Sequence, residues 1–204
     1  MVYRKTPATE ARKSARRTTL LEAAINMFGS YGYHAATVPM IVAEAGCSVG
    51  SFYAHFQNKE DIFAAVLETL GQRVFEVMKK AEERCHPLEI RNSVESLFLY
   101  LAENPQEARI LIVESSGLSP RLEQVRRRLL SHEIDQVKQD LEASPELVDV
   151  MDSTIAARCM VGAVFESITS WLEEDPDNRK SAVEVARAVA NYNLRAIRRV
   201  RSQS

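Results

Sequence analysis

The chain has 204 residues, of which 46% are hydrophobic and 26% charged, a composition typical of a folded globular protein. It has no run of 18 apolar residues and no apolar stretch near its start, so we expect no membrane partner and a cytoplasmic location. The three cysteines include no pair at metal-ligand spacing, which argues against a disulfide framework and against a zinc site. The low content of glycine and proline, 7 residues of each, favours a helix-rich fold.

The net charge of −2 is unevenly distributed along the chain. Residues 1–17 contain six basic side chains and one acidic one, a net charge of +5, so the other 187 residues carry −7. A basic end on an acidic chain is suited to attracting nucleic-acid phosphates. The alternative is a charged, disordered tail of no functional significance.

The first helix is predicted by apolar spacing. We expect residues 1–11 to form a flexible basic arm and residues 12–58 a three-helix domain. In that domain Leu21, Ile25 and Phe28 recur at helical spacing, and the segment 29–32, Gly-Ser-Tyr-Gly, ends the helix.

The segment 37–59 has the pattern of a helix-turn-helix. Thr37 suits an N-cap and Pro39 a first helical turn, where its missing N–H has no intrahelical partner to lose. Gly46 follows the short helix at the position where a left-handed residue ends one. Ser48 can cap a second helix, on which Phe52 and Phe56 share one face. Phe52, Phe56 and Cys47 are therefore predicted to lie in the core. Two helices joined by such a turn can place the second in the major groove of DNA.

These residues carry a family resemblance. The order Gly46, Ser48, Gly50, Ser51, Phe52, Tyr53, His55, Phe56 and Lys59, preceded by Phe28, Gly32, Tyr33 and Thr37, resembles the DNA-binding domain of the TetR family of bacterial transcription regulators. The resemblance covers roughly residues 12–63. Beyond them, the chain is similar to the family only in its length and helical pattern.

The resemblance implies DNA contacts for particular residues. Tyr53, His55 and Lys59 match phosphate-contacting positions, and Gly50 and Ser51 match positions near bases. The full predicted interface is Thr37, Ser48, Val49, Gly50, Ser51, Tyr53, Ala54, His55 and Lys59, with Arg12, Lys13 and Arg16 added from the basic end. Thr37 and Ser48 are also simple caps by their position. Val49 departs from the Lys or Arg of many members and offers only an apolar surface, suited to a thymine methyl. We therefore expect few direct contacts to bases, so that sequence specificity depends more on the basic residues of the arm and on DNA shape.

The rest of the chain is predicted to be helical. A long helix over residues 59–85 would link the first domain to a second, residues 59–204. Further helices are expected over 88–103, 105–115, 119–143, 144–174 and from the turn at 175–178 to about 201, since Pro, Asn, Ser and Gly mark each break. The predicted fold class is all-α, with about nine helices: an N-terminal helix-turn-helix domain and a C-terminal bundle for ligand binding and dimerisation.

The second domain contains apolar side chains on several helices. In the family such residues surround a cavity for a small apolar or amphipathic effector, and the alternative is an ordinary packed core. The predicted pocket residues are Leu70, Val74, Met78, Phe98, Leu101, Ile110, Leu111, Glu114, Arg158, Met160 and Phe165. The sequence does not identify the effector.

The last two helices have more apolar surface than one neighbour can cover. We expect a two-fold, four-helix dimer interface, in agreement with the resemblance. Its predicted residues are Ile155, Gly162, Ala163, Val185, Val189 and Tyr192.

No catalytic or cofactor motif is found. The four histidines are scattered, and there is no glycine-rich phosphate loop or nucleophile motif. Cys85 beside His86 could suggest a thiol sensor, but such a pair at a helix end is more often incidental.

The predicted function is therefore a homodimeric, ligand-responsive transcription regulator. We expect a repressor of an inverted-repeat operator in double-stranded DNA, released by an unidentified small-molecule effector and requiring no cofactor. The alternatives are a helical protein-interaction module without specific DNA binding and a helical enzyme, which would need clustered catalytic groups.

Overall fold

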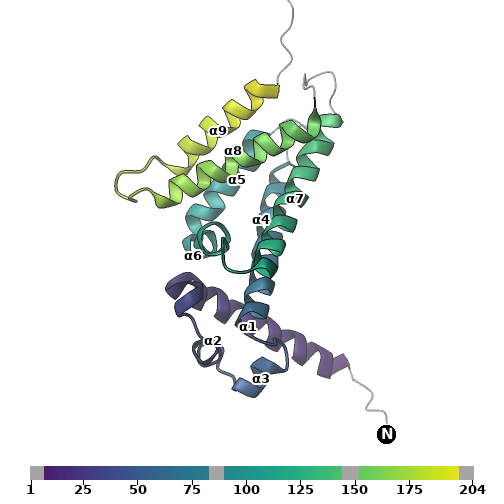
Figure 1. The fold of residues 1–204 in the computed structure, drawn as a ribbon, viewed down its shortest axis with the longest axis vertical. Coiled ribbons are helices and arrows are strands. Elements are labelled where there is room, and N and C mark those ends of the chain that lie inside the picture. The colour runs from purple at the N-terminus through teal and green to yellow at the C-terminus, as the bar shows by residue number, and fades with distance from the viewer. Residues whose placement is uncertain (1–6, 83–89, 144–151, 198–204) are drawn as a thin grey trace, which may run out of the picture.

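The computed structural model describes residues 7–82, 90–143 and 152–197, and over these residues the fold is all-α, as predicted (Figure 1). Nine α-helices and one π-helix are present in these three segments. They are α1 (Pro7–Ala35), α2 (Val38–Glu44), α3 (Val49–Tyr53), α4 (Lys59–Glu82), α5 (Ile90–Glu103), α6 (Pro105–Ala108), the π-helix η1 (Arg109–Glu114), α7 (Pro120–Glu142), α8 (Ser153–Glu173) and α9 (Ala182–Ile197).

The predicted helix caps are confirmed. Thr37 Oγ1 accepts a hydrogen bond from the Met40 N–H (3.4 Å), and Ser48 Oγ accepts one from the Ser51 N–H (3.2 Å). Both hydroxyls satisfy an amide that has no partner within its own helix. Gly46 ends the first of these helices with a φ of 57°, a value that glycine adopts at little cost.

The boundaries of three predicted elements differ. The first helix begins at Pro7, so residues 7–11, expected in the flexible arm, are helical, and it continues past the end predicted at 29–32 to Ala35, with a kink at Gly32. The helix expected from residue 144 begins at Ser153, because Asp152 is extended and caps it with its carboxylate. The single helix expected over 105–115 is one α-helical turn followed by a π-helix. The start of the predicted helix at 88 and the ends predicted at 85 and 201 lie outside the described residues.

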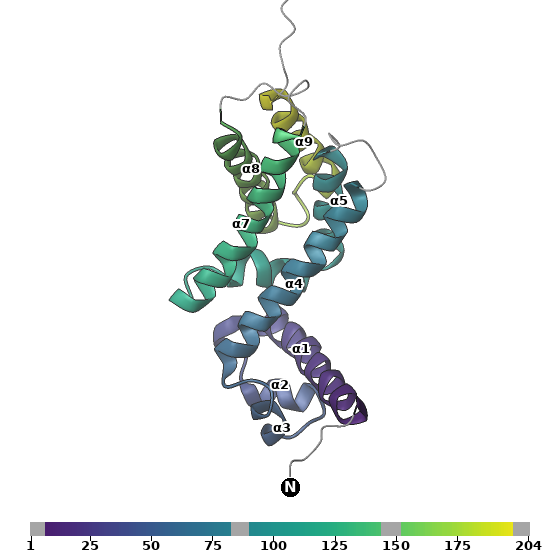
Figure 2. The ribbon, with the colours of Figure 1, turned by 90° about the vertical axis from the view of Figure 1, so that its right-hand side faces the viewer.

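The helices form two lobes. Helices α1, α2 and α3 make up the lower lobe, and α4 leaves it to run up beside α5 and α7 in the upper lobe, which α8 and α9 complete (Figures 1 and 2). The most extensive helix contacts in the upper lobe are between α5 and α9, α4 and α5, and α7 and α8. Within the described segments, α4 therefore contacts helices of both lobes.

The hydrophobic core does not divide at residue 58. The lower cluster contains Phe28, Phe52 and Phe63, but also Ile110 of η1 and Leu122 of α7, all fully buried. A second cluster lies around Phe98 and Trp171, and a third joins α7, α8 and α9. The lower lobe is thus completed by residues from the second half of the chain.

Candidate nucleic-acid interface and effector cavity

The helix pair α2–α3 is held by its inward face. Phe52 and Phe56 are buried, and Cys47 is half-buried against the same cluster, as predicted. Phe52 lies between the rings of Phe56 and Tyr53, with centroids 5.8 and 5.3 Å away. These anchors fix the orientation of α3, and its opposite face points away from the upper lobe (Figures 1 and 2).

The predicted DNA-contacting residues share the exposed end of the lower lobe. The exposed ones are Thr37, Ser48, Val49, Gly50, Tyr53 and Ala54, and the half-buried ones are Ser51, His55 and Lys59. Val49 and Tyr53 keep 47% and 57% of their surface, large fractions for such side chains. In the part of the chain that the structure describes, no later helix covers α3 (Figure 2), so its outer face is open to solvent.

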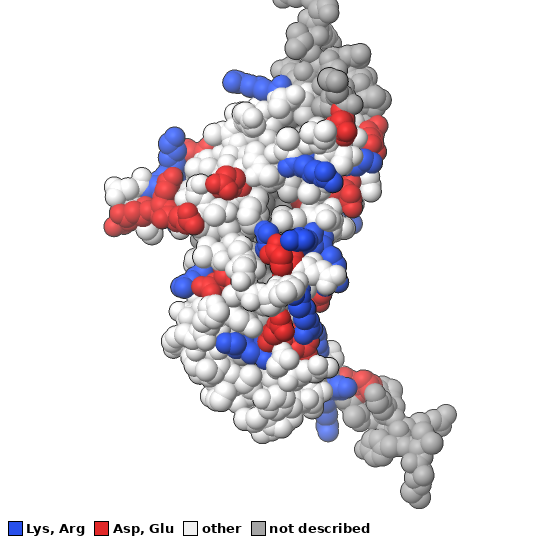
Figure 3. All heavy atoms as spheres, viewed as in Figure 1, with Lys and Arg blue, Asp and Glu red and all other residues white. Residues whose placement is uncertain are grey.

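The basic side chains near α3 lie on the neighbouring helix α1, and α3 itself has none. Arg12, Lys13 and Arg16 are exposed on α1, and the face of the lower lobe in Figure 3 is mainly uncharged, with blue side chains beside the start of α1. Partial burial, followed by the charges of Lys13, Arg17 and Arg16, lowers the pKa of His55. His55 therefore lies in the field of Lys13 and Arg16, two of the residues predicted to contact DNA.

The ammonium of Lys59 is hydrogen-bonded within this chain. Its ammonium donates hydrogen bonds to the backbone oxygens of Tyr33 (2.8 Å), His34 (3.2 Å) and Ala36 (3.1 Å), and lies 4.5 Å from the Tyr33 ring centroid. An ammonium has three donors, so in this arrangement none remains for a phosphate. Lys59 closes the carbonyl end of α1 and fixes the start of α4 against it.

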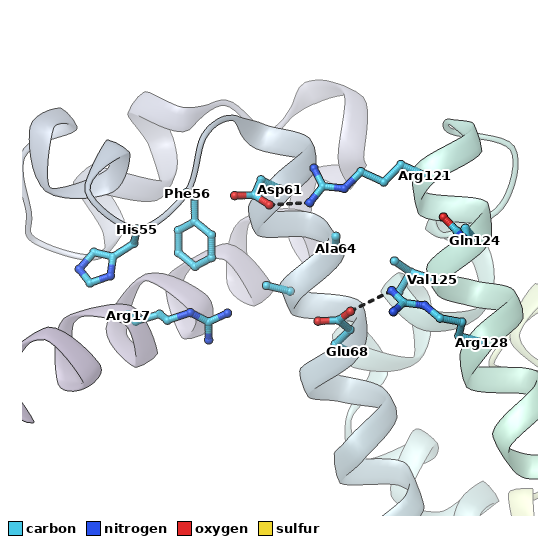
Figure 4. A pocket seen from close by; sticks show the side chains of 11 residues that line it. Arg17, His55, Phe56, Asp61, Ala64, Glu68, Arg121, Gln124, Val125 and Arg128 are labelled. Carbon is cyan, nitrogen blue, oxygen red and sulfur yellow. Dashed lines mark hydrogen bonds and ion pairs between the residues drawn. The ribbon is translucent and has the colours of Figure 1, made fainter. Parts of the chain in front are cut away.

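A polar cleft of about 380 Å³ separates the lower lobe from α7 (Figure 4). Arg121 pairs with Asp61 (2.6 Å) and Arg128 with Glu68 (3.1 Å), joining α7 to α4, while the Arg17 guanidinium lies 5.2 Å from the Phe56 ring centroid. Burial alone would raise the pKa of Asp61, but hydrogen bonds from the Gln57 N–H and Arg121 lower it. Two ion pairs across the cleft thus join α7 to the first half of α4.

A larger cavity of about 750 Å³ lies inside the upper lobe, between α4, α5, η1, α7 and α8. Its wall is mostly apolar, and its volume is that of a pocket for a small ligand. Six predicted pocket residues line it: Val74, Met78, Leu101, Leu111, Met160 and Phe165.

The other five predicted pocket residues do not line this cavity. Leu70, Phe98 and Ile110 are fully buried in packed clusters, where they fill space and do not border it. Arg158 is exposed on α8. Glu114 points to the lower lobe, where its carboxylate accepts a hydrogen bond from the Tyr33 N–H (2.9 Å).

Sequence reasoning missed several polar residues of the cavity wall. Arg126 pairs with Glu123 (2.8 Å) and lies 6.0 Å from the Phe165 ring centroid, and His132 packs on Phe75 with ring centroids 4.7 Å apart. Burial raises the pKa of Asp140, another wall residue. On an otherwise polar helix such residues give no sequence signal, because solvated faces have the same composition.

Helices α8 and α9 expose a surface that only partly matches the predicted interface. Ile155 and Tyr192 keep 58% and 67% of their surface, and Gly162 is exposed. Ala163 is half-buried, whereas Val189 is buried and Val185 packs on the second cluster, so these two valines belong to this chain's own core. Among the described helices, α8 alone has the length and apolar composition to cross a bilayer, yet only 28% of its most apolar stretch is buried.

Metal and thiol chemistry have little support in the described segments. No group of three or more His, Cys, Asp or Glu side chains there could hold a metal ion. Cys85 and His86 lie outside the described residues. Cys47 and Cys159 are free thiols, half-buried and exposed respectively.

The fold and the exposed helix pair define a helix-turn-helix protein of the regulator class. The family described as "Bacterial regulatory proteins, tetR family" matches residues 20–66. The uncharacterized HTH-type transcriptional regulator YdgC of Bacillus subtilis (strain 168) is 30% identical over 165 residues, 76% of this chain and 80% of the relative. The chain belongs to the TetR family of bacterial transcription regulators.

Two further similarities are to a fatty acid metabolism regulator and to a transcriptional regulator in complex with stearoyl-CoA. The fatty acid metabolism regulator protein of Bacillus subtilis (strain 168) is 24% identical over 168 residues, 80% of this chain and 87% of that protein. The structure of FadR from Bacillus subtilis in complex with stearoyl-CoA has a TM-score of 0.76 and 22% identity, covering 87% of this chain and 97% of that one. This likeness extends the shared fold to the upper lobe.

Proposed function

We propose that the protein is a homodimeric repressor that binds an inverted-repeat operator and releases it when an effector enters the cavity of the upper lobe. The observation that carries the proposal is the joint presence of an uncovered helix pair α2–α3 and a 750 Å³ cavity, with α4 common to both lobes. Residues 12–58 would act on DNA, residues 59–204 would bind the effector and the second copy, and α4 would link them. Release requires that the effector bind more tightly to the arrangement of the dimer that cannot bind DNA than to the arrangement that can.

The DNA contacts would come from α3 and its borders. Tyr53 and His55, with Arg12, Lys13 and Arg16, would meet phosphates. Val49, Gly50, Ser51 and Ala54 would approach bases. The exposure of all of these residues except the half-buried Ser51 and His55, and the basic side chains of α1, support this assignment.

The effector would be a long apolar chain. The mostly apolar wall supports this choice, as do the name of a relative, a fatty acid metabolism regulator, and a solved structure of similar fold that is in complex with stearoyl-CoA. The cationic wall residues Lys79 and Arg126 suit an anionic group on such a ligand.

The dimer would form through α8 and α9. Ile155, Gly162 and Tyr192 lie on surfaces that the described residues leave uncovered, and the apolar but poorly buried α8 is accounted for by a second copy. A membrane would also cover an apolar helix, so sedimentation of the protein with vesicles would count against the dimer.

Fluorescence anisotropy with a duplex selected by the protein from a random pool tests the function. We expect salt-dependent, sequence-selective binding that stearoyl-CoA weakens about 5- to 150-fold. Tyr53→Phe should weaken binding to all sequences alike, because it removes a phosphate donor, whereas Val49→Lys should change the preferred sequence.

One observation favours a second candidate, a protein-interaction module. The exposed positions of α3, which are Val49, Gly50 and Tyr53, and its exposed C-cap Ala54 bear no cationic side chain. If no duplex binds even at low salt, the module would replace the regulator.

A further inference from the structure

The π-helix η1 lies between the cavity and the lower lobe. Leu111 and Ile112 line the cavity, and Ile110 is buried in the lower core. Leu111 also packs on the lower cluster, whereas Ile112 packs on the second cluster. The three successive residues 110–112 together therefore contact both lobes. A single turn of π-helix inside α-helical surroundings is rare and is often found at functional sites.

Glu114, the last residue of η1, is tied to the kink of α1. One carboxylate oxygen accepts a hydrogen bond from the Tyr33 N–H (2.9 Å), and the other pairs with Arg109 (3.1 Å). At Gly32, φ is 78° and a Cβ would lie 2.9 Å from the Glu114 carboxylate. Only glycine therefore allows both the kink and the approach of the carboxylate.

Tyr33 passes this contact on to the helix-turn-helix. Its carbonyl oxygen is one of the three that bind the Lys59 ammonium, and Ala36 supplies another. Ala36 directly precedes Thr37, the cap of α2, and Lys59 is the first residue of α4. A continuous set of contacts thus runs from the cavity wall through Glu114 and Tyr33 to the starts of α2 and α4.

We infer that η1 couples the cavity to the DNA-binding lobe, with Glu114 as its latch; the inference rests on the proposed function. A ligand that displaces Leu111 and Ile112 changes the register of η1, and one residue of register rotates the following side chain by about 100°. The Glu114 carboxylate then leaves the Tyr33 N–H. The α1 kink and the Lys59 cluster lose their support, and α2–α3 shift relative to α4. Glu114 is a positioning residue, since it touches neither DNA nor ligand.

The first test compares operator binding with and without stearoyl-CoA. In Glu114→Ala, the weakening caused by stearoyl-CoA should fall at least about fivefold relative to wild type, although the ligand itself still binds. Glu114→Gln keeps an acceptor for Tyr33 and should keep most of the response. Glu95→Ala removes a comparable ion pair, with Arg187 (2.8 Å), between α5 and α9 and should respond like wild type. An unchanged response in Glu114→Ala would overturn the latch.

A second test needs neither DNA nor ligand. Leu111→Trp fills the cavity from η1 and should speed hydrogen exchange of the Tyr33 amide about tenfold. Val137→Trp fills the same cavity from α7 and should not, while amides of α8 report global unfolding in both variants. Equal Tyr33 exchange in the two variants would overturn the latch. A wild-type protein that ignores DNA or stearoyl-CoA would instead overturn the proposed function and leave this exchange test decisive.

Discussion

At the scale of single residues, charge and burial decide which groups of the lower lobe can meet DNA. His55 borders α3 and lies in the field of three cations on α1, whereas Tyr53 is exposed and Lys59 is engaged. Residues that share one surface therefore have unlike roles, and two of them lead to measurable predictions.

His55 should make operator binding stronger at lower pH. In the free protein its pKa is lowered by partial burial and by Lys13, Arg17 and Arg16, so the imidazole is neutral at pH 7. DNA phosphates would raise that pKa, so binding takes up a proton and affinity rises as pH falls from about 7.5 to about 5.5. Anisotropy titrations across this range should show the rise in wild type and lose most of it in His55→Gln. A pH profile unaffected by that substitution would exclude the assignment.

Lys59 should contribute to stability. Lys59→Met keeps most of the apolar stem but leaves three carbonyl oxygens without their shared donor, two of them in part-buried bonds. We expect the free energy of unfolding to fall by about 1–3 kcal/mol, measured by urea denaturation. Lys138→Met, which breaks a surface pair with Glu142 (3.1 Å), should cost at most about 0.5 kcal/mol. Equal effects of the two substitutions would refute the structural role of Lys59.

At the scale of helices, close approach between elements explains glycines that look like helix breakers. Gly29 lies inside α1, and a Cβ there would be 2.5 Å from the Gln106 Cβ and 3.1 Å from its Cα. The residue is therefore needed where α6 packs on α1. Nearby, Arg73 of α4 binds Glu107 (2.5 Å) and also Glu22, so three helices meet at this point.

Gly29→Ala should destabilise the protein despite the better helix propensity of alanine. The clash involves Gln106 backbone, which cannot move as a side chain does, so we expect a loss of about 1–3 kcal/mol in urea denaturation. Gly50→Ala is the matched control, because only Ser48 Oγ lies near, at 3.9 Å. It should leave stability unchanged or raise it by up to about 1 kcal/mol. A stable Gly29→Ala protein would mean that α6 does not pack this closely on α1.

At the scale of the whole molecule, the surface of α8 and α9 should control assembly. Ile155→Arg places a charge on the proposed interface and should convert a dimer to a monomer in light scattering at micromolar protein. Leu99→Arg is a control at an exposed apolar residue of α5, 40% exposed, and should stay dimeric. A monomeric wild type, or a dimeric Ile155→Arg, would remove the interface.

Much of the fold can be predicted from the sequence because its signals are local. Ser119 followed by Pro120 predicts a helix start, and the structure has the same cap, with Ser119 Oγ 3.3 Å from the Leu122 N–H. The cavity wall cannot be predicted in this way. Leu70 and Gly71 are neighbours on α4, yet the first is packed core and the second borders the cavity, and only the placement of other helices separates them. The partners of Lys59 and Glu114 are likewise distant in sequence.

The hydrophobic core of the lower lobe includes Ile110, Leu122 and Val125, which follow the helix-turn-helix in the sequence. A fragment that ends after α4 would lack these side chains and expose the apolar surfaces they cover. It should therefore be poorly folded and prone to aggregate. A chimaera that takes its DNA-binding lobe from a relative would accordingly also need residues 105–125 from that relative. Such a chimaera would thus acquire the DNA specificity of the relative together with part of the relative's cavity wall, because residues 105–125 include Leu111 and Ile112.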